Sequence, residues 1–177
     1  MAVHDRFIEA CITGDKVARC MSLRSQGVVM RDRATIHRIA ALDQVHPLAQ
    51  HRFLANWTRM SVWQRIRAKI ADDDLFFAAL RKLLPGTDPL SPAIMLYRGQ
   101  PKNELLGMSW TLSPGVAELF SHWQSLPERG GVIFYARLSE EIICAPCELG
   151  HHEGEYIVDP RGVVAGFYNP WDDDPRA

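Results

Sequence analysis

Long apolar runs are missing from this sequence of 177 residues. No stretch approaches the roughly 18 consecutive apolar residues that a membrane-spanning helix needs. The first six residues also lack the basic start and apolar run of a secretory signal peptide. We therefore expect a soluble, cytoplasmic protein that does not associate with membranes.

Cysteine is scarce, with four residues at Cys11, Cys20, Cys144 and Cys147. The first two fall in a region with helical periodicity, and the last two form a lone C-x-x-C. This pattern does not build the disulfide framework of a small secreted domain. Reduced thiols are expected.

Several catalytic signatures are also absent. The chain contains no Walker loop, no G-x-G-x-x-G after a strand, no H-E-x-x-H and no G-x-S-x-G. These absences argue against P-loop nucleotide hydrolases, Rossmann-type dehydrogenases, zincin proteases and α/β-hydrolases.

Charge is balanced overall but unevenly distributed. The 20 basic and 21 acidic side chains give a net charge of −1. Residues 1–90 carry 14 basic and 9 acidic side chains, a net of +5, and residues 91–177 carry 6 and 12, a net of −6. A basic half could face an acidic partner or nucleic acid. The basic residues never form a run, which favours two simpler explanations: the charges lie on solvated helix faces, or the two halves of the chain attract each other.

The first ninety residues have the periodicity of helices. Apolar residues recur every three or four positions, which predicts a helix ending at Gly14, a second ending at Gly27, and a long helix from Pro47 to Ile70. Asp72 is placed to cap a further helix. These helices form a predicted N-terminal lobe.

Short apolar runs typical of strands follow residue 90. Ser113 and Pro114 open one inserted helix, whose predicted apolar face is Val116, Leu119, Phe120 and Trp123. Residues 162–167 are predicted to return as a hairpin partner of the strand at 155–158. Helices followed by strands predict an α+β fold. The predicted strands are residues 93–98, 107–111, 132–136, 142–143, 155–158 and 162–167.

Polar residues lie at or beside three of these strands, namely Arg98, Ser109 with Thr111, and Glu153 with Glu155. Each alone is unremarkable: such an arginine usually forms a surface ion pair, and such a Glu-x-Glu usually marks an exposed edge. In this order, however, they resemble the arginine–serine–glutamate class of ADP-ribosyltransferases. The matching segments are Leu96-Tyr97-Arg98-Gly99, Gly107-Met108-Ser109-Trp110-Thr111 and Glu153-Gly154-Glu155-Tyr156-Ile157-Val158.

The resemblance extends over about residues 93–168. The family members that the sequence resembles include small bacterial and phage-borne proteins. It implies an N-terminal helical lobe followed by an ADP-ribosyltransferase-like split β-sandwich. Residues 1–90 would form the lobe and residues 91–177 a β-rich catalytic core that binds NAD, the two packed as one compact unit. NAD would be the co-substrate, and no metal is expected.

The resemblance also implies roles for the matching residues. Glu155 would be catalytic, with a fixed carboxylate that stabilises the positive charge developing on the ribose of NAD. Arg98 would bind the pyrophosphate, because a guanidinium fork suits phosphate oxygens. Ser109, supported by Thr111, would orient Glu155 or the ribose. Next to this motif, the candidate cofactor-binding residues are Tyr97, Gly99, Trp110 and Phe120. Tyr135 is a further candidate to stack on nicotinamide. Each of these aromatic rings could instead be part of the hydrophobic core.

Glu153 bears on the acceptor. In the family, glutamate two residues before the catalytic one usually accompanies arginine modification, so an arginine of a host or target protein is favoured. This activity is compatible with a toxin or effector that is delivered into another cell. Such a protein could have an immunity or regulatory partner. The basic helices at 52–82 are the candidate surface for docking to the target. Nucleic acid stays open as a target. Trp110 departs from the family's small central residue, and two histidines precede Glu153.

Three alternatives remain. Cys144, Cys147, His151 and His152 offer zinc ligands within nine residues, which would suit a metal-stapled interaction module, although one short cluster is a weak signal. The same fold could hydrolyse NAD without a macromolecular acceptor. A helical interaction protein could carry these motifs without catalysis.

Overall fold

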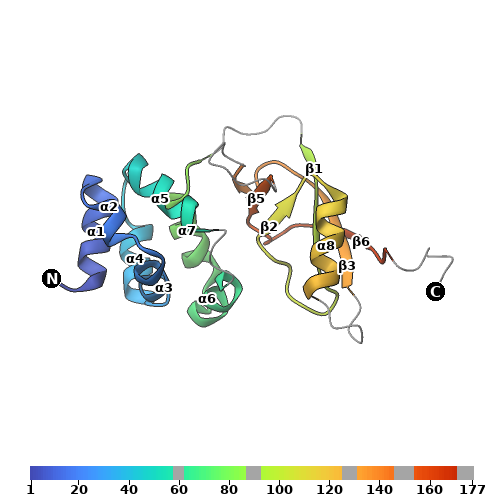
Figure 1. Cartoon of the computed structure of the whole chain (residues 1–177), viewed down its shortest axis with the longest axis horizontal. Coiled ribbons are helices and arrows are strands. Elements are labelled where there is room, and N and C mark those ends of the chain that lie inside the picture. Colours follow the sequence, from blue (N-terminus) through green and yellow to red (C-terminus); the bar gives the residue numbers. More distant parts are fainter. Residues whose placement is uncertain (58–61, 87–92, 125–130, 146–153, 171–177) are drawn as a thin grey trace. The chain divides into compact units, whose positions relative to one another are not determined.

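The computed structural model describes residues 1–57, 62–86, 93–124, 131–145 and 154–170. The chain divides into two compact units, Met1–Gly86 and Thr87–Ala177. Helices make up the first unit, and an antiparallel sheet with one helix makes up the second (Figure 1). The predicted α+β class is confirmed. Among the described residues, no helix has the length and apolarity needed to cross a bilayer.

The helices of the first unit follow the sequence prediction in part. Gly14, with φ of 75°, ends the first helix as expected. The second predicted helix is two helices, Val17–Cys20 and Leu23–Val29, so the prediction that Gly27 ends it is wrong. The predicted long helix is two helices. The elements are α1 (Val3–Thr13), α2 (Val17–Cys20), α3 (Leu23–Val29), α4 (Arg33–Ala40), α5 (Pro47–Trp57), α6 (Trp63–Ile70) and α7 (Asp73–Leu83).

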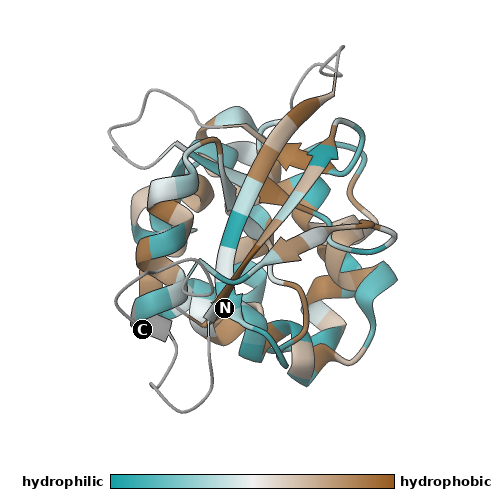
Figure 2. Ribbon diagram, turned by 90° about the vertical axis from the view of Figure 1, so that its right-hand side faces the viewer, coloured by the Kyte–Doolittle hydropathy of each residue, from teal (hydrophilic) through white to brown (hydrophobic). Residues whose placement is uncertain are grey.

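Aromatic side chains build the core of the helical unit. The rings of Trp57 and Trp63 stack with centroids 4.4 Å apart, and Phe53 packs against both. All three are buried, and the Trp63 indole N–H donates to the Trp57 carbonyl at 2.9 Å. Hydrophobic and hydrophilic segments alternate along the helices (Figure 2), as expected for helices that bury one face.

A capping carboxylate makes the stability of the helical unit depend on pH. Asp32 accepts the Thr35 backbone N–H at the start of α4 and also accepts the Thr35 hydroxyl. That hydroxyl bond is the main reason why the pKa of the Asp32 carboxyl is lowered; His4 contributes too. A lowered pKa means that the ionised form stabilises the fold above the unfolded-state pKa of about 3.9, and that this contribution is lost as the pH falls.

We therefore expect Asp32→Asn to lower the free energy of unfolding at pH 7 by about 0.5 kcal/mol, the size of a surface charge interaction. Asparagine caps helices as well as aspartate does, so the variant isolates the charge. Urea unfolding followed by far-ultraviolet circular dichroism measures this difference, which should shrink below pH 4. A difference that is constant from pH 7 to pH 3 would contradict the assignment.

The second unit is a sheet with the strand order β4-β5-β2-β1-β3-β6, in which all neighbours are antiparallel. The prediction that residues 162–167 pair with the strand at 155–158 is wrong. Instead, β6 pairs with β3 at the opposite side of the sheet. The elements are β1 (Ile94–Pro101), β2 (Ser109–Thr111), α8 (Pro114–Gln124), β3 (Gly131–Leu138), β4 (Ile142–Cys144), β5 (Glu155–Val158) and β6 (Gly166–Tyr168).

The sheet is nearly divided between β1 and β2. β1 pairs with β3 along its whole length, from Ile94 to Pro101. Within the described residues, β1 and β2 share a single residue pair, Tyr97 with Thr111. Two three-stranded halves, β4-β5-β2 and β1-β3-β6, therefore meet at one point.

The two faces of this sheet are buried differently. α8 lies on the face to which Gly99 belongs, and it comes so close that a Cβ at Gly99 would be 1.7 Å from the Ala117 carbonyl oxygen. The predicted apolar face of α8 is wrong at Leu119, which is 52% exposed, whereas Ala117 and Ser121 are buried. The opposite face buries an apolar cluster of Leu96, Trp110, Ala136, Leu138, Ile142 and Val158.

Candidate functional site

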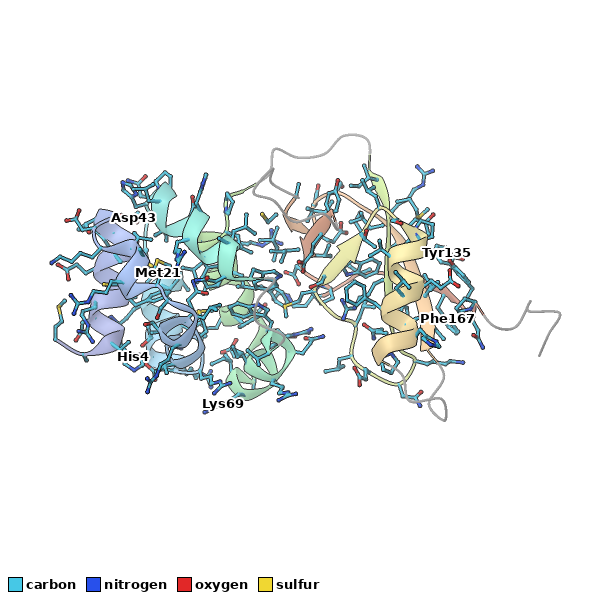
Figure 3. All side chains as sticks on the ribbon, viewed as in Figure 1. His4, Met21, Asp43, Lys69, Tyr135 and Phe167 are labelled. Atoms are coloured by element: carbon cyan, nitrogen blue, oxygen red, sulfur yellow. The ribbon has the colours of Figure 1, made fainter. Side chains whose placement is uncertain are left out.

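Register places four of the polar and aromatic residues in one line across the sheet. Glu155 on β5 pairs with Thr111 on β2, Thr111 pairs with Tyr97 on β1, and Tyr97 pairs with Tyr135 on β3. Figure 3 labels Tyr135, at the β3 end of this series. Residues directly opposite each other in antiparallel strands share a face. We call Glu155, Thr111, Tyr97 and Tyr135 the cross-strand row. Ser109, two residues before Thr111, lies on the same face.

Thr111 connects this row to the start of α8. Its hydroxyl oxygen accepts the backbone N–H of Ser113 at 3.1 Å. The Ser113 hydroxyl in turn accepts the Val116 N–H at 3.3 Å, as the predicted helix cap requires. Thr111 is buried and Ser109 is half-buried. The hydrogen bond from the Ser113 N–H to the Thr111 hydroxyl joins the end of β2 to the helix that follows it.

Arg98 reaches the same region from the other face of the sheet. Strand alternation directs its Cβ opposite to that of Tyr97. Its guanidinium reaches β2, where Nη1 donates to the Ser109 carbonyl oxygen at 2.5 Å, and its Nε donates to Gln100 Oε1 on β1 at 2.6 Å. Arg98 thus bridges the two strands beyond their shared pair.

Charge links Arg98 to the row. Burial lowers the pKa of the Arg98 guanidinium to about 10, because removing the cation from water disfavours it. The negative charge of Glu155, followed by that of Glu104, acts in the opposite direction. The guanidinium therefore stays protonated at neutral pH, and the Glu155 carboxylate is among the charges that stabilise it.

The other cofactor-binding candidates differ in their surroundings. Trp110 is 1% exposed and donates its indole N–H to the Gly107 carbonyl at 3.0 Å, so its ring has no exposed face on which a ligand could stack. Gly99 lies under α8. Tyr97 and Phe120 are half-buried.

Part of the predicted site lies outside the described residues: Glu153, Cys147, His151 and His152. Cys144 is buried, and its thiol donates to the Ala145 carbonyl oxygen at 3.4 Å. Among the residues that the structure describes, no group of three or more His, Cys, Asp or Glu side chains is arranged to hold a metal ion.

The sequence analysis assigned no role to two residues at this site, Gln100 and Gly107. Gln100 is buried and accepts from Arg98, and Gly107 lies so close to the guanidinium that a Cβ there would be 2.0 Å from Arg98 Nη2. The available signal for Gln100 was its spacing, since it shares a strand face with Arg98 two residues earlier. Gly107 had no comparable signal, because the side chain that excludes a Cβ comes from another strand.

Comparisons of the chain with protein-family models, with curated proteins and with solved structures gave no match. The functional argument therefore depends on the geometry of Arg98, Ser109, Thr111 and Glu155.

Proposed function

We propose that the protein is a mono-ADP-ribosyltransferase that cleaves NAD and transfers ADP-ribose to a macromolecular target. The observation that carries this proposal is the cross-strand row, which aligns Glu155, Thr111 and Tyr97 on neighbouring strands. The Arg98 guanidinium bonds to the Ser109 carbonyl and is under the charge of Glu155. The Glu155 carboxylate and the hydroxyls of Ser109 and Thr111 therefore belong to one face of the sheet, and the Arg98 guanidinium, which starts from the opposite face, reaches β2 beside them.

The reaction needs such a carboxylate. The bond between C1′ of the ribose and the nicotinamide nitrogen breaks, and its electron pair leaves with nicotinamide. Positive charge develops on the ribose, and a fixed Glu155 carboxylate stabilises it more in the transition state than in the ground state. The acceptor nucleophile then bonds to C1′ and releases its proton.

Arg98 is suited to the pyrophosphate of NAD. A guanidinium has five N–H donors, and Gln100 and Ser109 take one on Nε and one on Nη1. The other donors are on Nη1 and Nη2, the pair of nitrogens that forms an end-on fork with phosphate oxygens. The charge is retained at neutral pH, since the pKa of about 10 lies well above it.

The division of the sheet also supports the proposal. The family resemblance implies a split β core, and the β4-β5-β2 and β1-β3-β6 halves meet at the single pair of Tyr97 and Thr111 within the described residues. Arg98 and Ser109 lie on the two strands that form that junction, and Glu155 lies on β5, the next strand beyond β2.

An arginine side chain of a host or target protein is the proposed acceptor. This assignment depends on Glu153, which lies outside the described residues and precedes Glu155 by two positions. A second carboxylate at that spacing could orient and activate a guanidinium.

Labelled NAD, incubated with the purified protein and a host lysate, tests the proposal. Label on a macromolecule supports transfer, and mass spectrometry then identifies the modified residue. Free ADP-ribose without a labelled macromolecule would favour NAD hydrolysis on the same fold. No cleavage of NAD, together with stoichiometric zinc in the purified protein, would favour the metal-stapled interaction module.

A further inference from the structure

Gln100 is a buried polar residue near the end of β1, and its side chain bonds to the loop that joins β1 to β2. Only 1% of it is exposed. Its Oε1 accepts from Arg98 Nε at 2.6 Å and from the Gly107 backbone N–H at 3.0 Å. Its Nε2 donates to the carbonyl oxygens of Glu104 at 3.1 Å and Leu105 at 3.3 Å. Both ends of the carboxamide are therefore satisfied inside the fold.

These four partners fix the orientation of the carboxamide. Turning it over would direct the NH₂ group at two N–H donors, Arg98 and Gly107, and the oxygen at two carbonyl oxygens. Neither contact can form a hydrogen bond, because an amide nitrogen only donates and its oxygen only accepts. Oε1 is consequently held against the Arg98 guanidinium.

We propose that Gln100 is a positioning residue that sets the orientation of the Arg98 guanidinium and couples it to the loop at 102–107. A long arginine side chain has several rotamers, and a buried acceptor on Nε selects among them before any ligand binds. Gly107 completes this arrangement, since its missing Cβ leaves room for the guanidinium. The consequence for ligand binding rests on the proposed function: Gln100 directs the Nη1 and Nη2 donors of Arg98 toward the pyrophosphate.

A spectroscopic experiment tests the positioning without NAD. The arginine Nε–H signal of Arg98 is assigned in a ¹⁵N spectrum by its loss in Arg98→Lys, and its exchange with water is measured. We expect Gln100→Met to accelerate this exchange about ten- to hundredfold, as for the loss of a hydrogen bond to a charged group. Gln100→Glu keeps the acceptor and should retain slow exchange.

Gln50→Met provides a matched control. Gln50 lies in the helical unit and also donates to two carbonyl oxygens, those of Lys82 at 3.0 Å and Leu84 at 3.2 Å. Its loss should leave the Arg98 signal unchanged. Equal exchange of the Arg98 signal in wild type and Gln100→Met overturns the proposal. If Gln100→Met does not fold, Gln100→Glu decides: slow exchange supports the positioning role, and exchange as fast as that of the exposed Arg31 overturns it.

Kinetics then separate this inference from the proposed function. In Gln100→Met we expect the KM for NAD to rise about tenfold with a smaller change in kcat, since pyrophosphate binding is weakened more than the chemical step. An unchanged KM overturns the role in ligand binding. If wild-type protein binds no NAD, the proposed function fails, whereas the effect of Gln100 on Arg98 exchange still stands or falls by the spectra.

Discussion

Replacing Glu155 by glutamine is expected to lower the turnover of NAD about 10²- to 10³-fold, as for the loss of one group that stabilises transition-state charge. Glutamine has nearly the same shape, so the β2–β5 pairing of Glu155 with Thr111 should persist. The lost negative charge removes the stabilisation of the cationic ribose. Release of nicotinamide from NAD, measured with and without lysate, gives the effect.

Glu140→Gln is the matched control, because Glu140 is exposed in the turn between β3 and β4. Its turnover should equal that of wild type. Glu155→Gln should also lower the pKa of Arg98 below about 10, because the negative charge of Glu155 raises this pKa in the wild-type protein. Nitrogen or carbon resonances of the guanidinium report this titration. Wild-type turnover in Glu155→Gln would show that the carboxylate has no part in the reaction.

Much of the secondary structure can be predicted from the sequence because its causes are local. An apolar run predicts β1, a serine followed by proline predicts the start of α8, and Asp72 caps α7 by accepting the Leu75 N–H at 3.0 Å. Each of these depends on residues within a few positions of one another.

Pairing and packing are less accessible, because their causes lie far apart in the chain. The segment after Gly162 was expected beside β5, but β6 pairs with β3. Strand alternation alone does not name a partner. The same applies to α8, where the small residues Ala117 and Ser121, and not Leu119, lie against the sheet because the missing Cβ of Gly99 lets the helix approach.

The candidate site shows the same division. Strand order and residue type are enough to propose Arg98, Ser109 and Glu155 as candidates, but the register that aligns Glu155 with Thr111 and Tyr97 depends on three strands. Trp110 was a candidate for stacking and lies in the core. A ring beside a polar motif can face either side of a strand, and only the register decides which.

Gly99→Ala is expected to destabilise the sheet unit by about 3 kcal/mol or more, at the upper end of overpacking effects. The new Cβ would lie 1.7 Å from the Ala117 carbonyl oxygen and 2.5 Å from the Ser121 nitrogen. Both are backbone atoms of α8, so the clash can be relieved only by moving the helix off β1. Urea unfolding followed by tryptophan fluorescence measures the loss.

Gly115→Ala on the same helix is the control, because its Cβ would meet only the Ser113 Oγ, at 3.8 Å. Alanine there should be neutral or stabilise the helix by up to about 1 kcal/mol. The pair also separates the two roles considered for Gly99. If Gly99 serves only to bind a cofactor, Gly99→Ala keeps wild-type stability and loses affinity for NAD. If Gly99 instead serves to let α8 pack on β1, the free energy of unfolding falls in Gly99→Ala. NAD turnover then falls as well, because Arg98 is the neighbouring residue on the strand that the helix covers.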